Sequence, residues 1–296
     1  MSKTLLDRIV EVVQAQVPLW ACELTSRHVI VAGVTKQRNK VKARLATELK
    51  AQSVTGSLTE TNIANKEATR ASVLGALNEA GFEGSEIAVI VPDDAVRIGF
   101  LTVEKLSKDP EVQQTFIRWK FKKSVPFDVE SAQIAFRILG TRADGSADML
   151  VTLSPRAVIQ EYENLFDSMD IHAGFVIPST LAALNLFIPP PADSLFIKIA
   201  PDCITTTIFQ HGRMQFYRRV VDGSAYEAAY PTVMYYQDKL GGKALGQLVV
   251  CSYDSDVRAS IEELQAKLDL RAEHLEPKTI DDIFKPALGG VHCEAI

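Results

Sequence analysis

Residues Ser194–Gly223 read SLFIKIAPDCITTTIFQHGRMQFYRRVVDG, and the order of side chains in this stretch decides the fold class. Apolar and polar residues alternate along it, the chain turns at His211-Gly212, and the alternation then resumes. A period of two predicts paired strands with one buried face, so we expect a meander of two or three strands. The same alternation in LWACELTSRHVIVAGVTKQ, residues 19–37, predicts a hairpin near the start of the chain that turns at Thr25-Ser26-Arg27.

The composition is typical of a soluble globular protein with a full core. The chain has 296 residues, 47% of them hydrophobic and 23% charged, which is enough for one large domain or two ordinary ones. Its net charge is −5 and it has no strongly basic tract, which argues against a nucleic-acid partner. The four cysteines are scattered without a CxxC or Cys/His cluster, so we expect reduced thiols and no metal site. No stretch approaches the ~18 consecutive apolar residues of a membrane span.

Helices and strands alternate through the rest of the chain. We expect further strands at 52–57, 86–92, 95–104, 131–140, 147–155, 171–178, 245–253 and 272–275. We expect helices at 3–17, 62–80, 109–124, 155–169, 179–187, 225–240, 255–268 and 280–288. Asp109 is placed to cap the third of these helices, and Pro110 suits its first turn.

The segment FIPPPAD, residues 187–193, is the clearest linker, because three consecutive prolines cannot continue a helix or a central strand. Each half of the chain begins with a strand meander and then alternates helices with strands. This order predicts a duplicated α/β core with a cleft between its halves. We expect residues 1–94 and 171–190 to form the first core subdomain, 95–170 an inserted subdomain, and 194–296 the second core subdomain.

Three segments, residues 91–139, 171–187 and 196–223, together resemble the PilM family of type IV pilus assembly proteins, which are actin-like and related to the cell-division protein FtsA. The first segment contains a helix whose end is rich in aromatic residues. The residues VPF, 125–127, follow this helix and precede the next strand. The second is the returning strand and helix, and the third is the hairpin quoted above. The resemblance implies an actin-like (hexokinase/Hsp70-type) fold with a small α+β insertion.

The family also implies a location and partners. Its members are cytoplasmic and bind the short N-terminal tail of the inner-membrane protein PilN, which couples the assembly motor to the membrane. We therefore expect a cytoplasmic protein that is peripheral to the inner membrane through its partners. The expected partner is a PilN-like tail, with a pilus motor ATPase as a further candidate.

Nucleotide-binding members carry an Asp and a Gly in the first hairpin, where they face phosphate and metal. The family pattern aligns with CELTSRHVI, Cys22–Ile30, so that Glu23 falls on the Asp and Thr25 on the Gly, with Ser26 in the same turn. The acidic group is kept, whereas a side chain replaces the glycine. Glycine matters here because a Cβ atom takes space that the ligand needs.

The second half departs further from the nucleotide-binding pattern. Lys198 falls on the second Asp and Ala200 on the second Gly, and a lysine cannot hold a metal-bound water as a carboxylate does. Ser252, Tyr253 and Asp254 stand where a Gly-Gly turn would let the backbone approach the adenosine. The short segment after Gly223 indicates that the fourth small subdomain of the fold is reduced.

We interpret the chain as a pseudo-ATPase scaffold that is not an enzyme, in which binding of ATP and Mg²⁺ is disfavoured. One alternative is an active ATP-binding switch that uses Glu23 and Lys198. Another is the cytoplasmic domain of a type II secretion component. Such a protein continues into a transmembrane helix, which this sequence lacks, so we rank it lower.

A partner surface is suggested by basic and aromatic residues of the insertion: Arg97, Phe100, Trp119, Lys120 and Phe127. Aromatic and arginine side chains are favoured anchors at interfaces. The competing interpretation is that Trp119 and Phe127 belong to the core. The amphipathic helix expected at 3–17 could likewise meet a membrane or a partner, but its mixed charges favour packing on the body of the protein.

Overall fold

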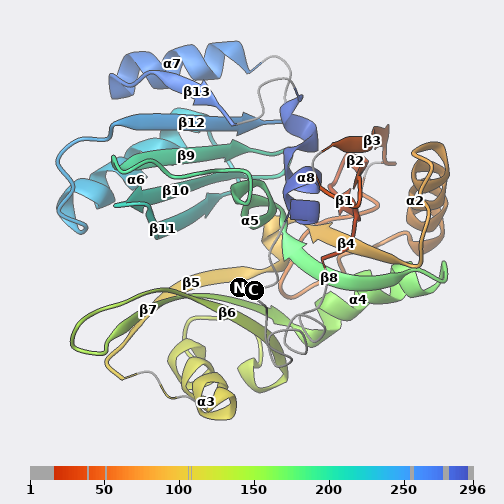
Figure 1. The fold of residues 1–296 in the computed structure, drawn as a ribbon, viewed down its shortest axis with the longest axis horizontal. Coiled ribbons are helices and arrows are strands. Elements are labelled where there is room, and N and C mark those ends of the chain that lie inside the picture. Colours follow the sequence, from red (N-terminus) through yellow and green to blue (C-terminus); the bar gives the residue numbers. More distant parts are fainter. Residues whose placement is uncertain are drawn as a thin grey trace, which may run out of the picture.

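The computed structural model describes residues 17–38, 40–50, 52–105, 107, 109–253, 257–275 and 280–292. The helix expected at 3–17 lies outside these residues except for Val17. The described strands form three sheets, ordered β3-β2-β1-β4-β8, β11-β10-β9-β12-β13 and β5-β7-β6 (Figure 1). The sheets follow the chain order of the three predicted subdomains, whose limits stay a prediction.

The first sheet has helices on both faces. Its strands are β1 (Trp20–Leu24), β2 (His28–Val34), β3 (Val41–Glu48), β4 (Glu86–Val91) and β8 (His172–Pro178). Strands β1 and β2 form the predicted hairpin, while β4 and β8 add in parallel. The outer face packs against α2 (Lys66–Glu79) and α4 (Arg156–Asp167). The inner face packs against α5 (Ser179–Leu184) and α8 (Lys285–His292).

The second sheet repeats this plan. Its strands are β9 (Ser194–Ile199), β10 (Ile204–Gln210), β11 (Arg213–Val220), β12 (Gln247–Ser252) and β13 (Ala272–His274). Strands β9, β10 and β11, which come from the stretch 194–223, therefore form an antiparallel meander. The outer face packs against α6 (Ala225–Asp238) and α7 (Arg258–Leu268). Residues 221–224 alone join β11 to α6.

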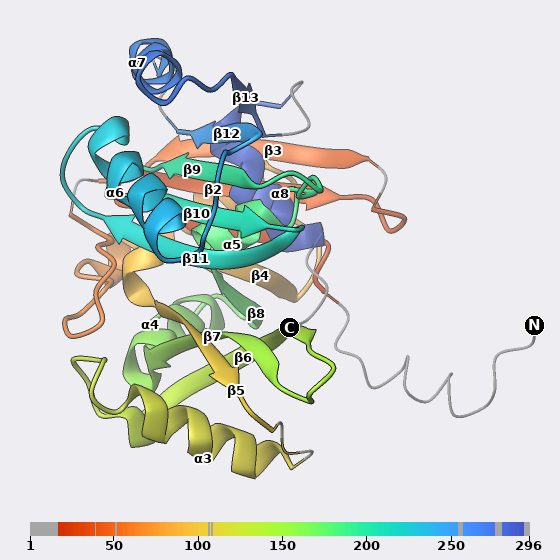
Figure 2. The same ribbon diagram turned by 90° about the vertical axis from the view of Figure 1, so that its left-hand side faces the viewer.

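The insertion is a small sheet with one helix. It contains β5 (Arg97–Val103), α3 (Pro110–Phe121), β6 (Ala132–Thr141) and β7 (Ala147–Pro155). Asp109 caps α3 as predicted, since its side chain accepts a hydrogen bond from the Glu111 amide. Figure 2 shows α3 on the side of this sheet that is turned away from the other two sheets.

Helices α5 and α8 lie between the two large sheets and contribute to one shared core. The two helices approach so closely that a Cβ atom on Gly289 would lie 1.8 Å from the Ala182 carbonyl oxygen. The sequence assigned α8 to the second core subdomain, whereas in the structure it packs on the inner face of the first sheet. The two halves therefore share this helix as part of their contact.

One predicted strand is wrong. Residues 52–57 contribute only an isolated bridge between Val54 and Ile63, and the third strand of the first sheet is β3. Strand β3 reads VKARLATE and lies at the edge of its sheet, where charged side chains are exposed. Edge strands with such side chains lack the clear alternation that identified the other strands.

Candidate functional site

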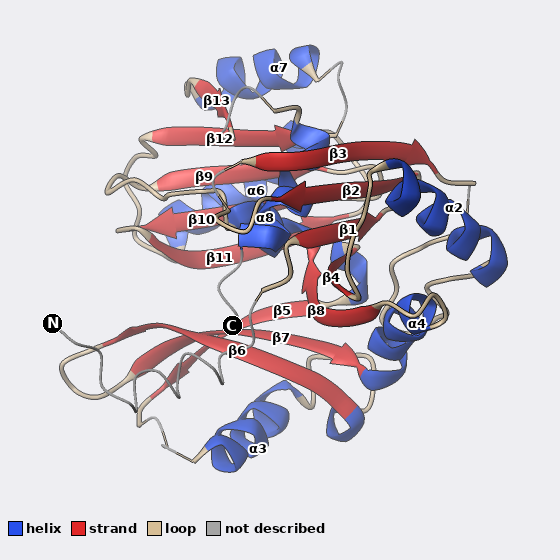
Figure 3. Ribbon diagram, turned by 45° about the vertical axis from the view of Figure 1, so that its right-hand side comes forward, coloured by secondary structure: helices blue, strands red, loops and turns tan. Residues whose placement is uncertain are grey.

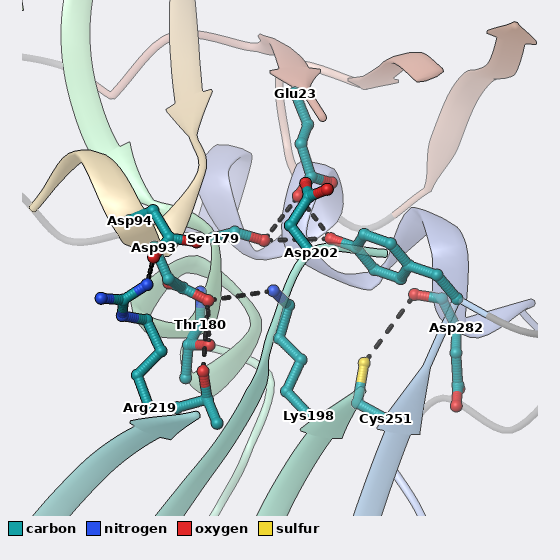
Figure 4. A network of polar contacts seen from close by, with 12 residues as sticks. Glu23, Asp93, Asp94, Ser179, Thr180, Lys198, Asp202, Arg219, Cys251 and Asp282 are labelled. Carbon is teal, nitrogen blue, oxygen red and sulfur yellow. Dashed lines mark hydrogen bonds and ion pairs between the residues drawn. The ribbon is translucent and has the colours of Figure 1, made fainter. Parts of the chain in front are cut away.

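The site lies between the two large sheets, and strand alternation brings its first two residues there. In β1, Cys22 and Leu24 pack on the outer face, so Glu23 points inward. In β9, Leu195 and Ile197 pack on the outer face, so Lys198 points inward from the opposite sheet. Figure 4 shows Glu23 and Lys198 entering the same space from the two halves.

The carboxyl ends of parallel strands supply most of the remaining groups. Asp93 follows β4, Ser179 and Thr180 follow β8, and Tyr253 follows β12. In α/β sheets, groups that follow the carboxyl ends of parallel strands meet at one edge, where ligands usually bind. This edge is therefore where the fold would hold a nucleotide.

A buried ion pair crosses this space. Lys198 Nζ lies 3.2 Å from Asp93 Oδ2, and both side chains are almost completely buried. Asp93 also accepts hydrogen bonds from the Thr180 amide at 2.8 Å and the Thr180 hydroxyl at 2.6 Å. Burial alone would lower the pKa of Lys198, but the carboxylates of Asp93 and Glu23 outweigh it and raise that pKa. Lys198 is thus a cation neutralised from within the protein.

Glu23 is enclosed by hydroxyl groups. Its Oε1 accepts hydrogen bonds from the Ser179 and Tyr253 hydroxyls, whose oxygens lie 3.0 Å apart. The Tyr253 ring also lies beneath the ammonium of Lys198, with 5.1 Å between the nitrogen and the ring centroid. Burial raises the pKa of Glu23 to about 7, and the charge of Lys198 only partly opposes this. Burial of Glu23 thus favours the protonated form of its carboxyl group over a wider pH range than in water.

The turn of the first hairpin forms hydrogen bonds within itself and with the turn between β9 and β10. Thr25 Oγ1 accepts hydrogen bonds from the amides of Arg27 at 3.2 Å and His28 at 2.8 Å. The Ser26 amide and hydroxyl both donate to the carboxylate of Asp202, which lies in the β9–β10 turn. The Asp202 carboxylate of the second half thus lies against the turn of the first hairpin.

Little space remains between these groups. The cavity that they line has a volume of about 20 Å³, enough for about one water molecule. Pockets that hold small-molecule ligands have volumes of roughly 300–1,000 Å³. In this conformation the protein's own side chains fill most of the space between the two sheets at this edge.

The residues predicted for this site, Glu23, Thr25, Ser26, Lys198 and Ala200, do come together. Sequence reasoning missed Asp93, Ser179, Thr180 and Asp202. Three of these directly follow the buried strands EIAVIVP and IHAGFVIP, and that position was the available signal. The contact of Asp202 with Ser26 joins residues 176 positions apart, and no local pattern indicates it.

The residues predicted for a partner surface do not form one patch. Phe100 packs toward the shared core on one face of the small sheet, whereas Phe127 packs under α3 on the other face. Trp119 is 66% exposed on α3, and Lys120 lies over its ring at 4.9 Å. Arg97 is exposed at the start of β5. Alternation along β5 places Phe100 on the face opposite α3, so these residues do not share one face, and their role in partner binding stays a prediction.

Two strand edges instead border a groove, which we call the strand-edge groove. Gln133 and Ala135 of β6 line one side, residues 173–176 of β8 line the other, and its volume is about 240 Å³. Within the described residues, β6 pairs only with β7, and β8 only with β4. Each strand therefore has one edge without ladder partners among the described strands.

The described residues contain no group of three or more His, Cys, Asp or Glu side chains that could hold a metal ion. No helix among them is both long and apolar enough to cross a membrane.

Two sheets of matching plan, with helices between them and polar groups at their facing edges, define the actin-like ATPase fold. The structure resembles that of a PilM–PilN type IV pilus biogenesis complex, with a TM-score of 0.73, 15% identity, and coverage of 93% of this chain and 99% of that one. It also resembles a Bacteroides thetaiotaomicron protein with an actin-like ATPase fold and unknown function (TM-score 0.58, 9% identity, coverage 92% and 95%). A third similar structure is the cytoplasmic domain of EpsL, an inner-membrane component of the type II secretion system of Vibrio cholerae (TM-score 0.53, 12% identity, coverage 92% and 93%). No protein-family model and no curated protein sequence matches the chain.

Proposed function

We propose that this protein is a cytoplasmic scaffold of a type IV pilus-like assembly machine that does not hydrolyse nucleotide. It binds the N-terminal cytoplasmic tail of a PilN-like inner-membrane protein and reaches the membrane through that partner. The observation that carries the proposal is the filled nucleotide position, where Lys198, Asp93, Glu23 and Tyr253 occupy the cleft. The likeness of the fold to the PilM–PilN complex supports the choice of partner.

The strand-edge groove suits an extended tail. A peptide in β conformation can satisfy its backbone groups on an open strand edge, while pockets receive alternate side chains. Here an edge lies on each side of the groove, and its apolar lining includes Leu153, Ile159 and Phe175. We therefore place the tail between β6 and β8, not on the surface around Trp119.

The test is titration of synthetic N-terminal tails from the membrane proteins encoded beside this one. Ala135 is an exposed residue of the groove, so Ala135→Trp fills the groove without disturbing the core. We expect it to weaken tail binding by about tenfold or more, which corresponds to about 1.4 kcal/mol. Ala143→Trp, an equally exposed change in the β6–β7 turn, is the matched control and should bind normally. Tails that bind both variants equally well would exclude this groove.

The cytoplasmic domain of a type II secretion component is the second candidate, favoured by the likeness to EpsL. Tails from pilus and secretion membrane proteins, compared at equal concentration, separate the two candidates. A motor ATPase is a further partner in this proposal, and the exposed Trp119 on α3 is a surface for it. Trp119→Ala should then weaken binding of the motor and leave tail binding unchanged.

A further inference from the structure

A second groove lies where the inserted sheet meets both large sheets, and we call it the central groove. Its volume is about 510 Å³, within the range of pockets that hold ligands. It is lined by β6, α5 and the β10–β11 hairpin, which come from the three different sheets and their helices. Figure 3 shows the inserted sheet running beneath β11 at this junction.

The central groove has a mixed lining, in which most residues are apolar but polar atoms provide more of the exposed surface. Leu139, Leu184, Phe187 and Met214 contribute aliphatic and aromatic surface, and Ile138 is 43% exposed at its side. The polar lining residues include Arg137, Arg213, Asn185 and His292. Such a mixed lining can receive an amphipathic helix, whose apolar face packs on the apolar residues while its polar flanks meet the polar ones.

The chain enters the described body next to this groove. Arg38 donates hydrogen bonds from its guanidinium to the carbonyl oxygens of Val17 and Val291, and to that of Pro18 at 3.4 Å. His292, the residue after Val291, lines the central groove. Val17 therefore lies near the rim of the groove, and a few preceding residues would be enough to reach its interior because an extended chain spans about 3.3–3.6 Å per residue.

The sequence before Val17 has the matching pattern. Leu5, Ile9 and Val12 are spaced as the i, i+4 and i+7 anchors of one helix face, and Leu6 and Val13 widen that face. From Leu5 to Val13 a helix would extend about 12 Å at 1.5 Å per residue. We propose that residues 1–16 of this chain are the occupant of the central groove.

In this position the segment would connect the three parts of the molecule. Its apolar face would contact β6 of the insertion, α5 of the first half and β11 of the second half. It would thus hold the insertion at one angle to the core. This inference does not depend on the proposed function, since the occupant belongs to the same chain.

The test uses a photo-crosslinking amino acid in the full-length protein. Placed at Ile9, it should crosslink within the chain to residues 137–139, 184–187 or 209–214, identified by mass spectrometry. Placed at Gln14, on the opposite face of the expected helix, it should give little of this product. Crosslinks from Ile9 to lipid vesicles, to a second copy or to other surfaces of the chain would overturn the proposal, as would the lack of any groove product.

Hydrogen exchange gives a second readout with a matched control. Ile138→Arg places a charge in the groove at a partly exposed position, and it should speed exchange of the amides of residues 5–13 about tenfold or more. Ile188→Arg changes an isoleucine that is 89% exposed and outside the groove lining, so exchange should stay as in the unmodified protein. Equal exchange in all three proteins would contradict the proposal.

Discussion

At the scale of single residues, the site combines one buried cation with two buried carboxyl groups. Lys198 neutralises Asp93 directly, whereas Glu23 is mainly surrounded by hydroxyls. A strongly buried carboxyl group without a close cation favours its protonated form. The structure thus gives the two acidic residues different surroundings: Asp93 is paired with Lys198, whereas burial raises the pKa of Glu23 to about 7.

This difference predicts how stability depends on pH. The pKa of Glu23 is about 7 in the folded protein and near its ordinary 4.5 when unfolded, so between these values the folded state alone keeps the proton. The stability contribution of Glu23 should therefore fall as pH rises from about 4.5 to 7 and then level off. Glu23→Gln removes this dependence.

We expect the stability of Glu23→Gln relative to the parent protein to increase by a few kcal/mol between pH 5 and pH 8, at about 1.4 kcal/mol per pKa unit. Urea unfolding across this pH range measures the difference, in which the contributions of other groups cancel. A difference that stays constant with pH would show that Glu23 titrates normally.

The ion pair predicts a second result. Lys198→Met leaves Asp93 buried without its cation, and removal of one partner of a buried pair typically costs about 3–5 kcal/mol. Asp93→Asn combined with Lys198→Met removes both charges and keeps an acceptor for Thr180, so it should regain a large part of this loss. Urea unfolding at pH 7 measures the two single variants and the double variant. If the loss of stability in the double variant equalled the sum of the losses in the two single variants, Lys198 and Asp93 would not be coupled.

Individual residues of the site were predictable to the extent that strand register determines them. The direction of Glu23 and Lys198 follows from alternation in β1 and β9. By contrast, the contact of Ser26 with Asp202 depends on how the two halves pack, and local sequence does not encode it.

At the scale of elements, the close contact of α5 and α8 controls how the two large sheets meet. Gly289→Ala would place a methyl group against the Ala182 carbonyl, so the helices must separate. We expect destabilisation of about 1–3 kcal/mol, typical of overpacked cores. Thermal and urea unfolding measure this effect.

Gly75→Ala is the matched control in another helix. Gly75 is exposed in α2, and a Cβ atom there would have no described neighbour within 4 Å. This change should stabilise the protein by about 0.5–1 kcal/mol, because glycine is a poor helix former. If Gly289→Ala and Gly75→Ala changed the stability alike, close packing of α8 on α5 would not explain the effect of Gly289→Ala.

Most elements were predicted because their pattern is strong: β4 is a continuous apolar run, and α4 has a clear helical period. Strand β3 was missed because only its backbone pairing, not a buried face, makes it a strand. The placement of α8 on the first sheet was also missed, because amphipathic periodicity identifies a helix but not the sheet that it covers.

At the scale of the whole molecule, several polar contacts join the two halves across the cleft. They include Lys198 with Asp93, Tyr253 with Glu23, Asp202 with Ser26, and Arg219 with Asp94. A nucleotide that entered the cleft would have to break several of them and leave buried charges without partners. We therefore expect a cleft that stays closed and a protein that acts through its surfaces.

A titration of MgATP and MgADP, followed by calorimetry and thermal unfolding, tests directly whether the cleft stays closed. A ligand that binds only the folded state at a hundredfold excess over Kd stabilises it by about 2.7 kcal/mol. We expect neither heat nor a change in Tm at millimolar nucleotide. Saturable heat with a rise in Tm would contradict a closed cleft, because it would show that nucleotide displaces Tyr253 and the Lys198–Asp93 pair and that the protein is a nucleotide-dependent switch.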